Sequence, residues 1–162
     1  MKEIIQKKIF NFFLNNNIEN FVGIPDSTIK HFIKEGIKHK KILITTREEE
    51  AIGIAVGHAL SNSNSLVFMQ NAGLGNSIST ITSLVQLYNI PLILFVGWRG
   101  YLSNDAPEHL KFGKIQPRLI QLLGLKSKVI TDKNWQKQCN WAINKIKNKK
   151  PCILLVKRDF YD

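Results

Sequence analysis

The stretch that decides the fold is Ser65-Leu66-Val67-Phe68-Met69-Gln70-Asn71-Ala72-Gly73-Leu74-Gly75-Asn76-Ser77. Its apolar run at 65–69 is typical of a strand that is buried on both faces of a sheet. The glycine-bearing turn after it leads into helical spacing from about 76 to 88. This stretch therefore predicts a strand, a turn and a helix in direct succession.

The same unit recurs along the rest of the chain, because apolar runs alternate with helical periodicity. Strands are expected at 20–24, 41–45, 65–69, 91–96, 128–130 and 152–156. Helices are expected at 4–13, 27–34, 47–61, 76–88, 107–123 and 134–148, with Gly36 ending the second. This alternation predicts an α/β fold of three αβα layers, in which helices cover both faces of a six-stranded parallel sheet. Functional side chains are expected just after the strands, because such sheets bind ligands at the carboxyl ends of their strands.

Length and composition indicate a single folded unit. The chain has 162 residues, of which 44% are hydrophobic and 22% charged, and this excludes a disordered or low-complexity protein. We expect one domain over 1–162. Residues 51–98 carry no Lys, Arg, Asp or Glu, but His58 and repeated Gly, Asn and Ser interrupt any membrane span. The charged N-terminus does not read as a signal peptide, and two cysteines make no disulfide framework, so a cytoplasmic location is expected.

The net charge of +11 has several possible partners, namely nucleic acid, an anionic substrate or an acidic subunit. A solvated lysine-rich surface is favoured over a nucleic-acid surface, because the sequence has no helix-turn-helix, RNA-binding aromatic motif or zinc spacing. We therefore expect neither nucleic acid nor a membrane as a partner.

The segment after the second predicted strand begins a helix with three glutamates at 48–50. Thr46 and Glu49 match a capping box, and acids in a first turn complement the helix dipole, so spacing alone favours a structural role for all three. The helix 47–61 also repeats small residues every fourth position. Another backbone can therefore approach it closely, either from the sheet or from a second subunit.

The turn after the third predicted strand bears Gly73 and Gly75, which would let backbone approach a ligand at a helix start. A dinucleotide fingerprint is excluded, because its third glycine falls on Ile78. Spacing alone leaves both a simple helix start and a ligand contact open. After the fourth strand, Arg99 suits an anion through its bidentate fork, and His109 can move protons near neutral pH. Each taken singly is more often a surface charge or an inert side chain.

Five motifs in order resemble the pyrimidine-binding domain of thiamine diphosphate-dependent decarboxylases, nearest to the sulfopyruvate and phosphonopyruvate decarboxylases. They are Gly-Ile-Pro-Asp-Ser at 23–27, Thr-Arg-Glu-Glu-Glu-Ala at 46–51, Met-Gln-Asn-Ala-Gly-Leu-Gly-Asn-Ser at 69–77, Tyr-Asn-Ile-Pro-Leu at 88–92 and Trp-Arg-Gly at 98–100. The resemblance implies the alpha subunit of a decarboxylase that converts 3-sulfopyruvate or 3-phosphonopyruvate to an aldehyde and CO2. The alternative is a non-catalytic binding or regulatory module of the same fold that uses its basic surface.

The resemblance also implies roles for individual residues. Glu48 is the glutamate in the family's register, since alanines follow it at three and seven positions and a glycine at nine. Its carboxyl would hydrogen-bond the aminopyrimidine ring nitrogen and promote the tautomer that activates the thiazolium carbon. The residues implied to pack around the pyrimidine are Pro25, Asn71, Gly73, Leu74, Gly75 and Asn76. Those implied to face the substrate are Asp26, Ser27 and His109, the last as a proton donor, and we add Arg99 as an anion clamp.

One departure from the family concerns the other half of the cofactor site. The family holds the diphosphate and Mg²⁺ with a Gly-Asp-Gly motif and a later Asn in a second domain, and these 162 residues contain no Gly-Asp dipeptide. No metal ligand is therefore expected in this chain. The resemblance implies a beta-type partner subunit that carries that motif, and we expect self-association through the helix 47–61.

Overall fold

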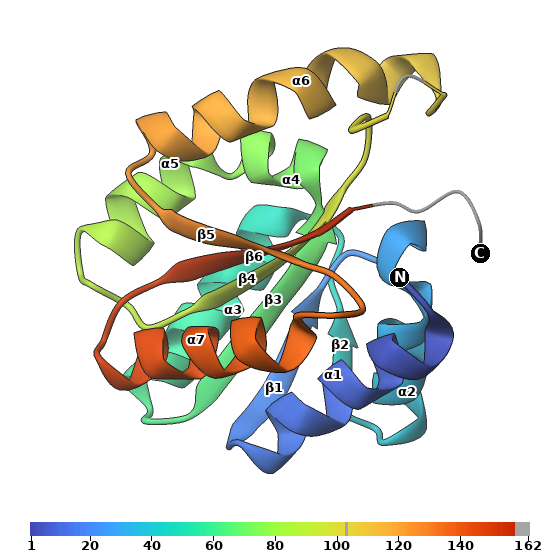
Figure 1. The fold of residues 1–162 in the computed structure, drawn as a ribbon. Coiled ribbons are helices and arrows are strands. Elements are labelled where there is room, and N and C mark those ends of the chain that lie inside the picture. The colour runs from blue at the N-terminus through green and yellow to red at the C-terminus, as the bar shows by residue number, and fades with distance from the viewer. Residues whose placement is uncertain (103, 158–162) are drawn as a thin grey trace.

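The protein is described by a computed structural model for residues 1–102 and 104–157. Its six strands form one sheet, all parallel, in the order β2-β1-β3-β4-β6-β5 (Figure 1). The strands are β1 (Ile18–Gly23), β2 (Ile42–Ile44), β3 (Asn64–Gln70), β4 (Ile93–Trp98), β5 (Lys126–Ile130) and β6 (Cys152–Lys157). The predicted six-stranded parallel sheet is confirmed.

Helices cover both faces of this sheet (Figure 1). One face is covered by α1 (Glu3–Asn15), α2 (Lys30–Lys38) and α7 (Trp135–Lys147), with the short 3₁₀ helix η1 (Ser27–Ile29) before α2. The other face is covered by α3 (Glu48–Leu60), α4 (Asn71–Asn76), α5 (Ile78–Thr80), the π-helical turn η2 (Ile81–Gln86) and α6 (Pro107–Leu122). Each face has its own apolar core, so the three-layer αβα prediction is confirmed.

Strand order determines where a ligand can bind. The chain steps from β1 to β2 on one side and then returns to place β3 on the other side of β1. Helices leave in different directions at such a reversal, and a crevice opens beyond the carboxyl ends of the strands there. Register brings these ends together, because Gly23 pairs with Phe68 in β3 and Gln70 pairs with Gly97 in β4.

The segment after β3 differs from its prediction. Residues 71–76 were expected as a turn, but α4 begins at Asn71, directly after the strand. The predicted turn is wrong because these glycines do not form a turn but provide room for side chains. A Cβ on Gly75 would lie 2.6 Å from the Phe112 ring of α6, and one on Gly73 would collide with Glu48.

Two further predictions were wrong for similar reasons. Gly36 does not end its helix, since α2 continues to Lys38, and the glycine is needed because a Cβ there would meet the side chains of Phe10 and Ile42. Strand β2 is not buried on both faces, because it is the edge of the sheet and Leu43 and Ile44 are about half exposed.

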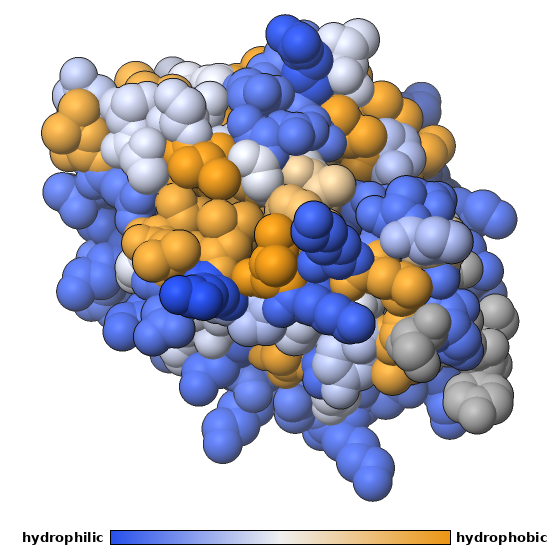
Figure 2. Space-filling model, turned by 90° about the horizontal axis from the view of Figure 1, so that it is seen from above, coloured by the Kyte–Doolittle hydropathy of each residue, from blue (hydrophilic) through white to orange (hydrophobic). Residues whose placement is uncertain are grey.

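The face of α6 combines charge with apolar surface. Ile115 and Leu122 on α6 and Ile78 on α5 are exposed, and Figure 2 shows apolar side chains gathered on the face seen from above, with polar ones around them.

Across the described part of the chain, no helix is both long enough and apolar enough to cross a membrane.

Candidate active site

Glu48 is the first residue of α3 and lies beside α4 at the carboxyl end of the sheet. Its side chain fills the space that a Cβ on Gly73 would need, since that Cβ would lie 2.5 Å from Oε1 and 2.7 Å from Cδ. The side chain is partly buried, and within the described ranges its carboxylate has no hydrogen-bond or ion-pair partner. A carboxylate in this position can accept a hydrogen bond or a proton from a ligand that reaches it.

The neighbouring glutamates behave differently. The Thr46 backbone N–H and hydroxyl both donate to Oε2 of Glu50, each at 3.0 Å, and these bonds hold the pKa of the Glu50 carboxyl below its ordinary value. The predicted Thr46–Glu49 capping box is wrong, because Arg47 is the N-cap residue and the third helical position therefore falls on Glu50. Glu50 therefore caps the helix, and Glu48 is left facing Gly73.

Asp26 joins the ends of three strands. It is 5% exposed, and its carboxylate accepts hydrogen bonds from the Thr28 N–H at 3.1 Å and from Nε2 of Gln70 at 3.3 Å. Its Oδ2 also takes up the space where a Cβ on Gly97 would be. The residues on either side, Pro25 and Ser27, are exposed at the same end of the sheet.

Arg99 and Asp105 form a buried ion pair in the loop after β4. Arg99 Nε donates to both carboxylate oxygens at 3.2 and 3.0 Å, and Nη2 donates to Oδ1 at 2.7 Å. The side chains are 11% and 1% exposed, and Asp105 also accepts from the N–H groups of Gly100 and Ala106. These hydrogen bonds hold the pKa of the Asp105 carboxyl well below its usual range, although burial alone would raise it, and they raise the pKa of Arg99.

This pairing bears on the anion clamp expected at Arg99. Much of the guanidinium charge is balanced within the chain, and the remaining contact runs from Nη1 to the Ser27 hydroxyl at 3.2 Å. The Nη1 edge and Ser27 are therefore the parts of this cluster that face outward together.

The residues expected around the pyrimidine have different surroundings in the structure. Asn71 is 1% exposed, and its amide bonds the backbone of Arg99 in both directions, at 3.0 and 3.1 Å. Leu74 belongs to the apolar core, and Asn76 is exposed at the end of α4. Gly73 is the member of this set that contacts Glu48.

His109 lies in the first turn of α6, with its side chain 17% exposed and Nε2 3.8 Å from a Glu108 carboxylate oxygen. Its carbonyl oxygen lies where a Cβ on Gly100 would be, so the loop and the helix pack tightly. Gln70 and Asp105 are site residues that the sequence motifs did not indicate. Position alone could have indicated both, because Gln70 ends a strand and Asp105 shares a loop with Arg99.

The described residues contain no cluster of three or more His, Cys, Asp or Glu that could hold a metal ion. The groups gathered at this edge instead suit an organic ligand with a polar heterocycle. They are an unpaired carboxylate at Glu48, a close glycine at Gly73 and a polar network around Asp26.

Comparison with known proteins decides the family. Residues 6–119 match the family described as "Thiamine pyrophosphate enzyme, N-terminal TPP binding domain", which covers more than half of the chain. The chain belongs to this family. The resemblance drawn from five short motifs is thus confirmed, and thiamine pyrophosphate, another name for thiamine diphosphate, is the cofactor of the family. The free carboxylate and the close glycine fit the pyrimidine ring of that cofactor.

Relatives in the thiamine pyrophosphate family include separate subunits and longer chains. The chain is 34% identical over 116 residues to "Sulfopyruvate decarboxylase subunit alpha" of Methanocaldococcus jannaschii, covering 70% of this chain and 69% of that protein. It is 30% identical over 118 residues to "Phosphonopyruvate decarboxylase" of Streptomyces viridochromogenes, covering 71% of this chain and 30% of that protein. The solved benzoylformate decarboxylase of Polynucleobacter necessarius shares the fold, with a TM-score of 0.74 and 20% identity over 95% of this chain and 30% of that one.

Proposed function

We propose that this chain supplies the pyrimidine-binding half of a thiamine diphosphate-dependent decarboxylase that acts on 3-sulfopyruvate or 3-phosphonopyruvate. The observation that carries the proposal is the Glu48 carboxylate, which has no partner among the described residues and lies against Gly73 beside the strand-order reversal. The names of the relatives from Methanocaldococcus and Streptomyces support the reaction class.

The chemistry divides between the cofactor and the chain. When bound, thiamine diphosphate supplies the electron sink that a 2-oxo acid needs to lose CO2. The Glu48 carboxyl would hydrogen-bond the ring nitrogen of the pyrimidine and would exchange a proton with it. Gly73 leaves room for the contact, and Asn71 fixes the start of α4 by bonding the Arg99 backbone.

The substrate side of the proposal rests on the ends of β1 and β4. The anionic tail of the substrate meets the Nη1 edge of Arg99 and the Ser27 hydroxyl, which lie 3.2 Å apart. Asp105 holds the guanidinium in place, so that it can offer this edge without reorganising. His109 donates a proton to the product, and Asp26 positions Ser27 through the start of η1.

The diphosphate and Mg²⁺ are bound by residues outside these 162, in a beta-type partner chain with the Gly-Asp-Gly motif. The exposed side of α3 and β2 supports docking of another chain at this end. An added Cβ on Gly53 or Gly57 would meet nothing within 4 Å, and Leu43 and Ile44 are about half exposed. Another backbone can thus reach α3 closely, whether it belongs to this partner or to a second copy of the chain.

Reconstitution tests the proposal. The chain is co-purified with a candidate partner of the beta type, and CO2 release from 3-sulfopyruvate and 3-phosphonopyruvate is measured with thiamine diphosphate and Mg²⁺. We expect turnover of one of the two acids by the pair and none by this chain alone. Full activity of this chain alone would contradict the assignment of the diphosphate site to another chain, and inactivity of the pair on both acids would contradict the substrate class.

A further inference from the structure

The positive charge of this protein is concentrated in one part of the chain. Residues 1–108 carry ten Lys or Arg and nine Asp or Glu, which is close to neutral. Residues 109–157 carry twelve Lys or Arg and a single acid, Asp132. These residues form α6, β5, α7 and β6, in which β6 and β5 are the last two strands at one edge of the sheet and α6 and α7 lie on its opposite faces (Figure 1). The net charge is therefore a local feature of this edge.

A cavity of about 340 Å³ lies within this basic part. Lys126, Lys145 and Lys150 line it, together with the amide side chains of Gln86 and Asn89. These residues lie near the amino ends of β4, β5 and β6. Glu48 lies near the carboxyl ends of the strands, and a six-residue strand spans about 20 Å. The cavity is thus remote from the candidate active site.

A second hollow of about 420 Å³ continues from the first, since Lys145 and Lys150 line both. It adds Trp141, whose ring lies 5.7 Å from the Lys145 ammonium nitrogen. Among the described residues, no carboxylate lines either hollow. The two together offer three cations, several amides and one aromatic ring.

No ion pair is found for these three lysines in the described part of the chain, and no carboxylate among the lining residues balances their charge. Like charges around one concave site repel each other, and a bound anion relieves that repulsion. Lysine ammonium groups bind phosphate as point charges, and cavities of roughly 300 Å³ and more hold small ligands.

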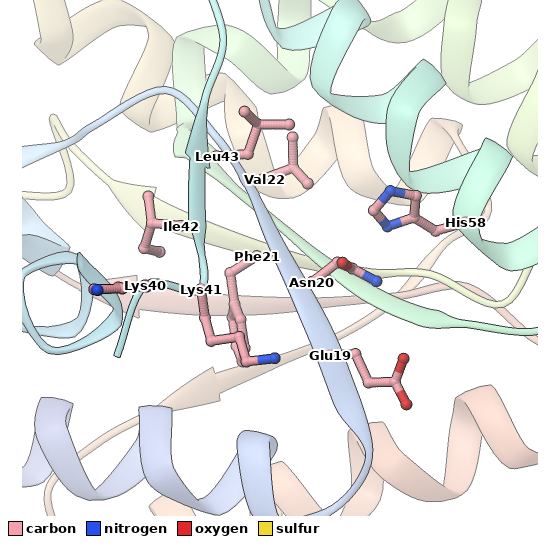
Figure 3. Close-up of a pocket in the computed structure, with 9 residues that line it drawn as sticks. All are labelled: Glu19, Asn20, Phe21, Val22, Lys40, Lys41, Ile42, Leu43 and His58. Carbon is pink, nitrogen blue, oxygen red and sulfur yellow. The ribbon is translucent and has the colours of Figure 1, made fainter. Parts of the chain in front are cut away.

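The hollow between β1 and β2 does not share these properties. It measures about 260 Å³ and is lined by Lys40 and Lys41, but also by the carboxylate of Glu19. Its charged side chains do not converge on one point (Figure 3). His58 there is engaged with the Ser65 hydroxyl at 3.2 Å.

We infer that the cavity lined by Lys126, Lys145 and Lys150 is a second ligand site, which binds small molecules bearing two or more phosphate charges. The phosphate groups lie among the three ammonium groups. In a nucleoside phosphate, the base can extend from there toward Trp141. This site lies near the amino ends of the strands, whereas Glu48 lies near their carboxyl ends. Its ligand is therefore neither the substrate nor thiamine diphosphate.

The test is an NMR titration of the full 162-residue chain with pyrophosphate and with ADP, at constant ionic strength. The test variant is Lys126→Gln/Lys145→Gln/Lys150→Gln. The control variant, Lys114→Gln/Lys133→Gln/Lys137→Gln, removes the same charge from the same basic part but outside the cavity. A third variant with arginine at the three cavity positions keeps the charge and shows whether a loss reflects misfolding.

We expect saturable binding of both probes, with the largest shifts at the amides of Gly124, Lys126 and Lys150. Three charge contacts of moderate strength together predict at least a tenfold weaker affinity in the test variant, and about unchanged affinity in the control and arginine variants. Tighter binding of ADP than of pyrophosphate, with shifts reaching Trp141, supports a nucleoside phosphate, and equal affinities support the phosphate groups alone.

Three results would overturn the inference. The first is no saturation by either probe at tens of millimolar. The second is an equal loss of affinity in the test and control variants, which would mean that binding depends on the net charge of this part of the chain and not on the cavity. The third is salt-dependent binding of duplex DNA without binding of pyrophosphate, which would assign the basic edge to nucleic acid.

Discussion

Replacing Asp105 with asparagine should destabilise the folded chain strongly. The carboxylate accepts hydrogen bonds from Nε and Nη2 of Arg99 and from the N–H groups of Gly100 and Ala106, and its side chain is 1% exposed. Asparagine keeps the shape but leaves the guanidinium, only 11% exposed, without its counter-charge. Breaking a buried pair in this way costs about 3–5 kcal/mol.

The assay is urea and thermal denaturation of the purified chain. For a chain of this length about 1 kcal/mol corresponds to 2–4 °C, so the melting temperature should fall by roughly 6–20 °C. The matched control is Glu3→Gln, which breaks the exposed contacts of Glu3 with Lys7 and His31 and should leave the melting temperature nearly unchanged. A loss below about 1 kcal/mol in Asp105→Asn would refute the argument, since the pair would then contribute no more than a surface ion pair.

Three further outcomes are expected. Because the folded pKa of Asp105 lies below the unfolded value of about 3.9, its contribution is complete above that value and is lost as the pH falls below it. The free energy of unfolding should therefore fall more steeply as the pH drops below about 4 in the wild type than in Asp105→Asn, and equal slopes there would contradict this. Cys139 and Cys152 should resist a thiol reagent at pH 8 until urea is added, because burial raises both thiol pKa values, that of Cys152 to about 12; fast reaction of the native chain would contradict this. Arg99→Ala should raise the KM of the reconstituted enzyme for its anionic substrate, and unchanged KM and kcat would remove Arg99 from the substrate site.

Periodicity in the sequence predicted the elements that pack by regular patterns. The apolar runs placed all six strands, and helices α3, α6 and α7 begin and end within a residue of their predicted bounds. These features were predictable because burial on both faces of a sheet leaves a direct pattern of Val, Ile and Leu.

Features that depend on tertiary neighbours were not predictable in the same way. In the sequence, Gly73 and Gly75 indicate a turn. The structure shows that they make room for neighbours instead, since the Glu48 side chain lies against Gly73 and Phe112 lies against Gly75. The capping glutamate depended on whether the N-cap was Thr46 or Arg47, which differ by one position. The Arg99–Asp105 pair depends on how the loop closes, and spacing in the sequence does not encode that closure.

Glu48→Gln in the reconstituted enzyme tests the role of this carboxylate most directly. Glutamine keeps the size of the side chain against Gly73 but cannot hold a proton in the same way, so kcat should fall by about 100-fold or more. The control Glu49→Gln removes the neighbouring carboxylate and should leave kcat within about twofold of the wild type. Wild-type turnover by Glu48→Gln, with assembly and melting temperature unchanged, would contradict the assigned role.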